Sequence, residues 1–219
     1  MIWDVNKWID ELALKLRSAF AGRLLFIGLQ GSYRRAEAKP GSDIDVVVIL
    51  DELSLEDLKE YRRIIGSLPE KEKACGFISG RGEIGNWPKM DIFQFRNDTR
   101  PVFGTLDGLV PVVEKKDIEE YIQVNCANLY HLAVHCYLYE RDINILKQIT
   151  KSLFFLFQAV NFLRTGKYAQ SRKELGALLP GEERALFEMD IGALTEPEIE
   201  KVYARLIGYF SRGIQGRVI

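Results

Sequence analysis

The chain has 219 residues, of which 47% are hydrophobic and 28% charged, and 30 Lys and Arg stand against 31 Asp and Glu for a formal net charge of -1. This composition is typical of a globular protein and excludes the disordered and fibrous classes. A net charge near zero supplies no overall basic field for a long nucleic acid or an anionic membrane. An anionic ligand must therefore be bound by a local arrangement of residues.

The first half of the chain combines helical and strand patterns. Apolar residues recur at helical spacing from Trp8 to Phe20, and Gly22 is placed to end that helix. Ser54 is placed to cap a second helix, which Gly66 ends. Apolar and β-branched runs bounded by turn residues predict three strands, at residues 24–29, 44–50 and 90–95.

The second half reads as helical. Strand patterns cease after Gly104, Gly108 and Pro111, and long helical periods follow. Predicted helices begin near Asp117 and Asp142, and two weaker ones lie near 171–190 and 196–211. We place a domain boundary between 110 and 116. The predicted fold class is α+β, with a small mixed-sheet domain at 1–113 followed by an antiparallel helical bundle domain at 114–219.

The sequence favours a cytoplasmic location. The first residues lack the basic flank and apolar run of a secretory signal, and no run of about 18 uncharged apolar residues occurs. The three cysteines form no CxxC pair. This argues against a disulfide framework and against a cysteine zinc site.

A pair of aspartates opens the second predicted strand. Asp43 and Asp45 are two residues apart, so strand geometry directs both carboxylates to the same face. Two neighbouring carboxylates repel each other unless a cation lies between them. Mg²⁺ accepts a few carboxylate oxygens and completes its coordination with water and substrate phosphates, so the pair predicts a metal site. The non-functional alternative is that the two aspartates lie in a solvated turn at the edge of a strand.

The turn after the first predicted strand contains Gly31 and Ser32. Glycine lets backbone N–H groups approach an anion, and a following helix adds a favourable dipole, so this turn is a workable phosphate cradle. Neither a Walker loop nor a dinucleotide G-x-G-x-x-G occurs in the chain. A phosphate cradle beside a carboxylate pair indicates phosphoryl or nucleotidyl transfer. An ordinary turn is the competing interpretation.

The order Gly31-Ser32, then Ser42-Asp43-Ile-Asp45, resembles the signature of the DNA polymerase β-like nucleotidyltransferase superfamily, especially its minimal members and the aminoglycoside nucleotidyltransferases. The chain departs from minimal members at Ala36, where they often have glycine. The resemblance implies a two-domain layout and the following site residues: Asp43 and Asp45 as metal ligands, Asp91 as a third ligand or general base, and Gly31, Ser32, Arg34, Ser42 and Lys151 as nucleotide contacts.

The resemblance also implies a reaction. We expect transfer of a nucleoside monophosphate (NMP) group from an NTP, with ATP as the expected donor, to a hydroxyl of a small molecule or protein, and release of pyrophosphate. Two Mg²⁺ ions, or Mn²⁺ in their place, are the implied cofactors. We expect neither a long nucleic acid nor a membrane as partner, and the oligomeric state, including a homodimer, stays open. The alternatives are an antitoxin-like or regulatory protein-binding module with weak or no catalysis, and a binding domain of another function.

Two further patterns have weaker functional interpretations. His131 and His135 lie four residues apart on a predicted helix, a spacing that can bind a metal, but no third ligand is evident. Packing among neighbouring tyrosines is the preferred interpretation. Basic residues also gather around Lys151, which is the preferred triphosphate contact of the helical half, although most surface lysines only contribute to solubility.

Overall fold

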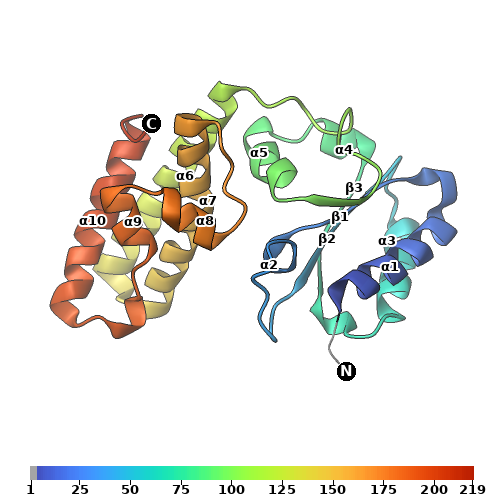
Figure 1. Cartoon of the computed structure of the whole chain (residues 1–219), viewed down its shortest axis with the longest axis horizontal. Helices are drawn as coiled ribbons and strands as arrows, with labels where there is room; N and C mark the ends of the chain where they lie inside the picture. The colour runs from blue at the N-terminus through green and yellow to red at the C-terminus, as the bar shows by residue number, and fades with distance from the viewer. Residues whose placement is uncertain (1–3) are drawn as a thin grey trace. The chain divides into compact units, whose positions relative to one another are not determined.

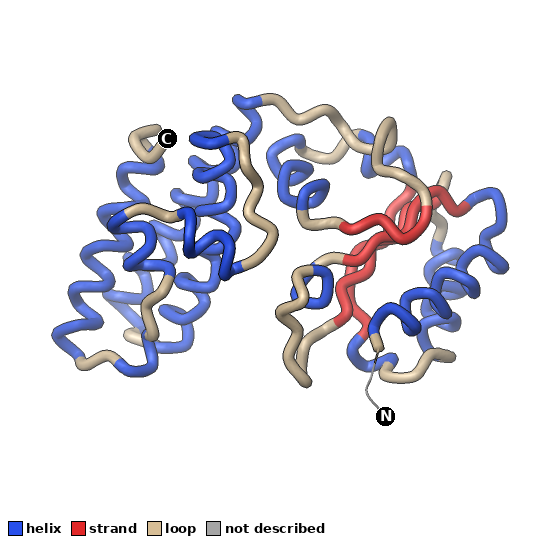
Figure 2. The backbone as a smooth tube through the Cα atoms, in the orientation of Figure 1, coloured by secondary structure: helices blue, strands red, loops and turns tan. Residues whose placement is uncertain are grey.

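The structure, a computed structural model, describes residues 4–219, and the chain divides into two compact units, Met1–Val112 and Val113–Ile219. Within residues 4–219, no helix is both long enough and apolar enough to cross a membrane. A mixed sheet with helices is followed by a purely helical region (Figures 1 and 2), which confirms the predicted α+β fold class.

The described part of the first unit contains a four-stranded mixed sheet and short to medium helices. Its strands are β1 (Leu24–Leu29), β2 (Ile44–Leu50), β3 (Ala74–Gly80) and β4 (Arg100–Phe103), and its α-helices are α1 (Val5–Phe20), α2 (Gly31–Arg34), α3 (Leu55–Gly66), α4 (Arg81–Gly85) and α5 (Lys89–Asn97). The strand order is β3-β2-β1-β4 (red in Figure 2). β1 pairs antiparallel with β2 and β4, whereas β2 and β3 are parallel and are joined through α3, as parallel strands require.

One hydrophobic core lies between the sheet and the helices α1 and α3 (Figure 1). The helical spacing of Trp8, Leu12 and Leu16 places all three on the buried face of α1. Alternate residues of β2 from Ile44 to Leu50 enter the same core, because successive strand side chains point to opposite faces. The intervening residue Asp45 therefore lies on the other face of the sheet.

The strand predicted at 90–95 is wrong, because these residues lie in helix α5. Ile92 and Phe93 are adjacent in sequence and both are buried. A helix can bury two adjacent residues on one face, whereas on a strand they point to opposite faces. The ring of Phe95 packs edge-on against Phe77 of β3, with centroids 5.3 Å apart, which fixes α5 against this strand.

Two strands were missed by the sequence interpretation. β3 contains Gly76, whose φ is +135°, and a Cβ at this position would lie 2.0 Å from the carbonyl oxygen of Val46. Glycine is normally unfavourable in strands, so the local pattern did not indicate one. β4 contains Pro101, which an edge strand tolerates because its outer side needs no N–H donor. Both strands form the edges of the sheet.

The second unit, within its described residues, is helical throughout. It comprises α6 (Lys115–His135), a π-helix at Cys136–Glu140, α7 (Ile143–Thr165), α8 (Arg172–Leu178), α9 (Gly181–Phe187), a 3₁₀ turn at Ile191–Ala193 and α10 (Glu196–Ile214). Asp142 caps α7, as predicted, and Gly166 ends it in the left-handed conformation. The cap of α6 is Glu114 rather than Asp117, and Asp117 instead completes its capping box. A Cβ at Gly213 would lie 2.2 Å from Cys126 Sγ, so glycine allows α10 to pack closely on α6.

Candidate active site

The candidate site lies where β1 ends and β2 begins. The two strands are antiparallel, so the end of β1 meets the start of β2. The backbone N–H of Gln30 donates to the carbonyl of Asp45 at 2.8 Å, and α2 starts at the next residue, Gly31. Antiparallel pairing thus brings together the two sequence motifs.

Gly31 is in direct contact with the Asp45 side chain. Its φ is +70°, a conformation that favours glycine, and a Cβ there would lie 1.9 Å from Oδ2 of Asp45. Neither the backbone angle nor the space admits a larger residue without rearrangement. Ser32 follows in α2 and is half-buried. The structure therefore brings the predicted phosphate cradle and one predicted metal ligand together.

The two aspartates differ in their environments. Asp43 is exposed immediately before β2, whereas Asp45 is half-buried within it. Burial raises the pKa of the Asp45 carboxyl above its usual value, the negative charges of Asp43 and Asp98 raise it further, and Arg35 acts in the opposite direction. A bound cation would relieve this charge repulsion. The site is electrostatically suited to a cation.

A buried ion-pair cluster that the sequence did not predict lies next to these aspartates. Asp98 is 7% exposed, and its Oδ2 accepts a 2.6 Å hydrogen bond from Nη1 of Arg35. Arg34 Nη1 lies 3.8 Å from the other oxygen, Oδ1, which accepts no hydrogen bond from the described residues. Arg34 also donates to the carbonyl of Asn97 at 2.9 Å, and Arg35 donates to Glu37 at 3.2 Å. The cluster fastens α2 to the segment between α5 and β4.

A second set of contacts fixes the start of α2. The side-chain amide of Gln30 donates to the Thr99 hydroxyl at 2.6 Å and to the carbonyl of Phe95 at 3.2 Å. Gln30 immediately precedes Gly31, so the turn that carries the motif is held at both ends. The only local sequence signal for Asp98 and Thr99 is a polar turn before β4, and nothing in it indicates a pairing with arginines more than 60 residues earlier.

Asp91 does not take the position that the resemblance implied. It is exposed in the first turn of α5, because the segment is a helix and not a strand. In the part of the chain that the structure describes, no group of three or more His, Cys, Asp and Glu side chains could hold one metal ion. The structure therefore does not bring Asp43, Asp45 and Asp91 together as one group, and it does not support Asp91 as a third ligand. The residue of β3 that pairs with Asp45 is Cys75.

The remaining residues singled out in the sequence lie in several different elements. The Ser42 hydroxyl accepts from the backbone N–H of Lys39 at 2.9 Å and so closes the turn before β2. Ala36 adopts a φ of +58°, so it retains the left-handed backbone that favours the glycine of related sequences. Lys151 is exposed on α7 of the second unit, and its contact with a nucleotide stays a prediction. His131 and His135 are exposed, with ring centroids 6.1 Å apart.

Comparisons with known proteins agree with this geometry. Residues 9–84 match the family model of the nucleotidyltransferase domain, a range that contains Gly31, Ser32, Asp43 and Asp45 and ends before Asp91. A solved structure of the spectinomycin adenyltransferase AAD(9) from Enterococcus faecialis, with ATP and spectinomycin, is similar at a TM-score of 0.57 and 17% identity, covering 96% of this chain and 99% of that one. At this identity the likeness concerns the fold. No curated protein matches the chain.

The matched domain and the site within it define a class of protein. Residues 9–84 carry a nucleotidyltransferase domain, which indicates an enzyme that transfers an NMP group from a nucleotide. This match supports the expected resemblance to the DNA polymerase β-like superfamily. The expected recognition and enzyme class are thereby confirmed.

Proposed function

We propose that the protein is a Mg²⁺-dependent nucleotidyltransferase that moves an NMP group from an NTP, with ATP as the expected donor, to an acceptor hydroxyl and releases pyrophosphate. The observation that carries the proposal is the direct approach of Gly31 to the carboxylate of Asp45. The proposal is supported by this contact, because a glycine turn can bind phosphate and a neighbouring carboxylate pair can bind a cation. These are the two groups that transfer from a nucleoside triphosphate requires.

The residues present fit Mg²⁺. The donor set is two carboxylates, Asp43 and Asp45, and Mg²⁺ is commonly bound by one or two carboxylates together with water and substrate phosphates. Burial is the main cause of the raised pKa of Asp45 and the charge of Asp43 adds to it, so a bound cation would stabilise the ionised form. When bound, the metal neutralises triphosphate charge and lowers the pKa of an attacking oxygen. The proposal includes two metal ions, which are Mg²⁺ or Mn²⁺ in its place.

The protein's own groups have positioning roles in this proposal. Gly31 and Ser32 offer the backbone and a hydroxyl to the phosphates, while the cluster of Asp98 with Arg34 and Arg35 keeps α2 in place. Arg34 and Arg35 are held by protein partners, so their proposed contribution to the nucleotide is a nearby positive charge. Holding these groups in a fixed geometry reduces the reorganisation needed at the moment of transfer.

The proposed acceptor is a small molecule with a hydroxyl group, with a protein side chain as the second possibility. Support comes from the similarity to the AAD(9) structure, which was solved with ATP and spectinomycin. The similarity covers nearly the whole of both chains, so it includes the helical unit. An aminocyclitol or amino sugar is therefore the first acceptor class to test.

A second candidate function is a regulatory or antitoxin-like module with weak catalysis. One observation favours it, namely that the described residues supply two carboxylates to the site and not a group of three. A site with fewer metal ligands holds its ions less tightly in the absence of substrate. The two candidates make opposite predictions about turnover.

The deciding experiment measures pyrophosphate release and a labelled NMP adduct in the presence of each NTP, Mg²⁺ and a panel of aminocyclitols. We expect turnover with one donor, and a loss of at least about 100-fold in Asp45→Asn, because the reaction depends on charge neutralisation. Asp91→Asn should retain activity because Asp91 is exposed on α5. Asp107→Asn, which replaces an exposed carboxylate, is the control. Mg²⁺-dependent NTP binding without turnover would support the regulatory candidate instead.

A further inference from the structure

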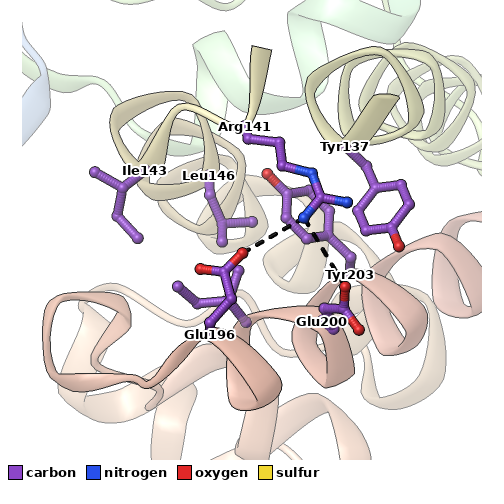
Figure 3. Close-up of a pocket in the computed structure, with 8 residues that line it drawn as sticks. Tyr137, Arg141, Ile143, Leu146, Glu196, Glu200 and Tyr203 are labelled. Carbon is purple, nitrogen blue, oxygen red and sulfur yellow. Dashed lines mark hydrogen bonds and ion pairs between the residues drawn. The ribbon is translucent and has the colours of Figure 1, made fainter. Parts of the chain in front are cut away.

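A pocket of about 130 Å³ lies within the second unit (Figure 3). Its lining residues come from the π-helix, from Arg141 directly after it, and from the N-terminal parts of α7 and α10. Its apolar surface is formed by Ile143, Leu146 and Ile199. The rings of Tyr137 and Tyr203 meet edge to face, with centroids 5.2 Å apart. The pocket thus combines an aliphatic floor with two aromatic rings.

The rim of this pocket carries charged groups. Glu196 and Glu200 are one turn apart on α10, and the guanidinium of Arg141 approaches both, at 3.5 Å and 3.9 Å (Figure 3). The same guanidinium lies 4.9 Å from the centroid of the Tyr137 ring. Two carboxylates and one arginine leave one negative charge uncompensated at the rim. The pocket already accommodates one cation from its own chain and attracts another.

The guanidinium of Arg141, which is the cation that the chain itself supplies to the pocket, is held weakly. The side chains of Arg141, Glu196 and Glu200 are all more than half exposed, and both ion pairs are longer than a normal hydrogen bond. Exposed pairs of this kind contribute little stability, so the arginine can move aside at small cost. Arg141 also has a left-handed backbone, with φ +49°, directly after the π-helix. Such backbone features concentrate at functional sites.

We propose that this pocket binds a compact organic monocation, a primary ammonium or guanidinium on a small apolar body. The ammonium group would take the place of the Arg141 guanidinium between Glu196, Glu200 and the Tyr137 ring, and the apolar body would contact Leu146 and Ile199. Cations over an aromatic face gain from the ring quadrupole, and the paired carboxylates add charge attraction. The volume suits a single six-membered ring, since an apolar cavity of about 150 Å³ accepts benzene. The proposal does not depend on nucleotidyl transfer.

The test is an NMR titration of the full-length protein with benzylamine as the probe. We expect backbone amide shifts concentrated at residues 137–146 and 196–203, with a Kd on the order of 1 mM for a ligand of this size. Benzyl alcohol has nearly the same shape without the charge and should bind at least about threefold more weakly. Benzoate, which is repelled by the two glutamates, should not bind.

Two variants separate the roles of the charges. Glu200→Gln should weaken benzylamine binding about threefold or more, because one carboxylate is removed. Arg141→Gly should strengthen binding about threefold, since it removes the competing cation and glycine adopts the left-handed backbone without strain. Glu188→Gln is the matched control, because Glu188 is equally exposed and ion-paired but does not line the pocket.

Several outcomes would overturn the proposal. These are equal affinity for benzylamine and benzyl alcohol, shifts spread over other acidic surfaces, an absence of shifts in the two named segments, or weaker binding in Arg141→Gly. If Arg141→Gly does not fold, Arg141→Asn replaces it, because asparagine also tolerates the left-handed conformation. Thermal unfolding of each variant verifies that the comparison is made between folded proteins.

Discussion

The absence of a side chain at Gly31 sets how closely α2 approaches the carboxylate of Asp45. We predict that Gly31→Ala lowers the free energy of unfolding by about 1–3 kcal/mol, the cost of an unfavourable backbone conformation. It should also weaken Mg²⁺-dependent NTP binding, because the new Cβ would lie 1.9 Å from Oδ2 of Asp45 and displace it. Urea denaturation and nucleotide titration measure the two effects.

The control for this change is Gly41→Ala. No atom lies within 4 Å of a Cβ at Gly41, and this residue has no positive φ. Its stability and nucleotide affinity should equal those of the wild type. If Gly31→Ala behaves like Gly41→Ala, the close approach of Gly31 to Asp45 has no functional consequence.

Asp98 is the residue on which the attachment of α2 depends. Asp98→Asn removes the charge that compensates the half-buried Arg34 and Arg35, so we predict a loss of about 3 kcal/mol in unfolding free energy. The exposed pair of Asp107 and Arg96 provides the comparison, and Asp107→Asn should cost less than about 1 kcal/mol. Chemical denaturation of both variants tests this difference. Equal costs would show that burial of the cluster adds no stability.

At the scale of single elements, the carboxylate of Asp57 both caps α3 and binds Arg23, which follows α1. Asp57 completes the capping box with Ser54, and both its oxygens accept hydrogen bonds from Arg23, at 2.7 Å and 3.0 Å. Arg23 follows α1, so Asp57 ties the start of α3 to the end of α1. The Arg23 guanidinium and Ser54 hold the pKa of this carboxyl well below its usual range.

This depressed pKa gives a pH-dependent prediction. The contribution of Asp57 is complete above its unfolded-state pKa of 3.8 and falls as the pH drops through the folded-state pKa. We expect Asp57→Ala to lower the unfolding free energy by about 1–2 kcal/mol at neutral pH, and the gap to the wild type to narrow below about pH 4. The exposed pair of Glu60 and Arg63 on the same helix is the control, and Glu60→Ala should cost clearly less than Asp57→Ala. A gap that is constant with pH would contradict the assigned pKa.

Elements whose signals are local were predictable from the sequence. Strand β1 is an apolar run, β2 is an apolar and β-branched run interrupted only by Asp45, and α3 and α7 have caps beside them. The edge strand β3 depends on pairing with β2, and Gly76 conceals it in the sequence. In α5 the apolar residues between 90 and 95 resemble the pattern of a strand. Tertiary contacts with Phe77 and the sheet determine its conformation instead.

The same distinction applies to the site. Gly31, Asp43 and Asp45 fall within a span of 15 residues, from the start of α2 directly after β1 to the start of β2, so the sequence could place them together. The contact between Arg35 and Asp98 spans 63 residues and joins two turns. The periodic pattern of hydrophobic residues predicts helices and strands, but it gives no information about a contact between two residues so far apart in the sequence. The expectation for Asp91 depended on a strand at 90–95, and that strand was wrong because these residues form α5.

The whole molecule consists of two units that each have a buried core. α1, β1, β2 and α3 enclose one core, while in the second unit Leu153, Phe157 and Leu206 are almost fully buried among α6, α7 and α10. We propose the predicted boundary, 1–113 and 114–219, as a boundary of autonomous folding. Residues 104–112 at the end of the first unit contain no helix or strand.

Expression of the two fragments tests this proposal. Each should unfold cooperatively, and the sum of their far-UV circular dichroism spectra should reproduce that of the full chain, because secondary structure would be unchanged. The fragment 1–113 should retain the Asp57 pH dependence. A fragment that lacks a cooperative transition would show that its core requires the other unit.

Because of the environments of its three cysteines, the wild-type protein can be labelled at a single position for spectroscopy. Cys75 is exposed and pairs in register with Asp45 on the adjacent strand, whereas Cys126 and Cys136 are buried, and burial raises the pKa of the Cys126 thiol to about 12. A thiol-directed nitroxide or fluorophore will therefore label one position, one strand away from the proposed metal ligands. Paramagnetic Mn²⁺ in place of Mg²⁺ would broaden or quench the signal of that label. Metal occupancy then becomes directly observable without introducing a single mutation.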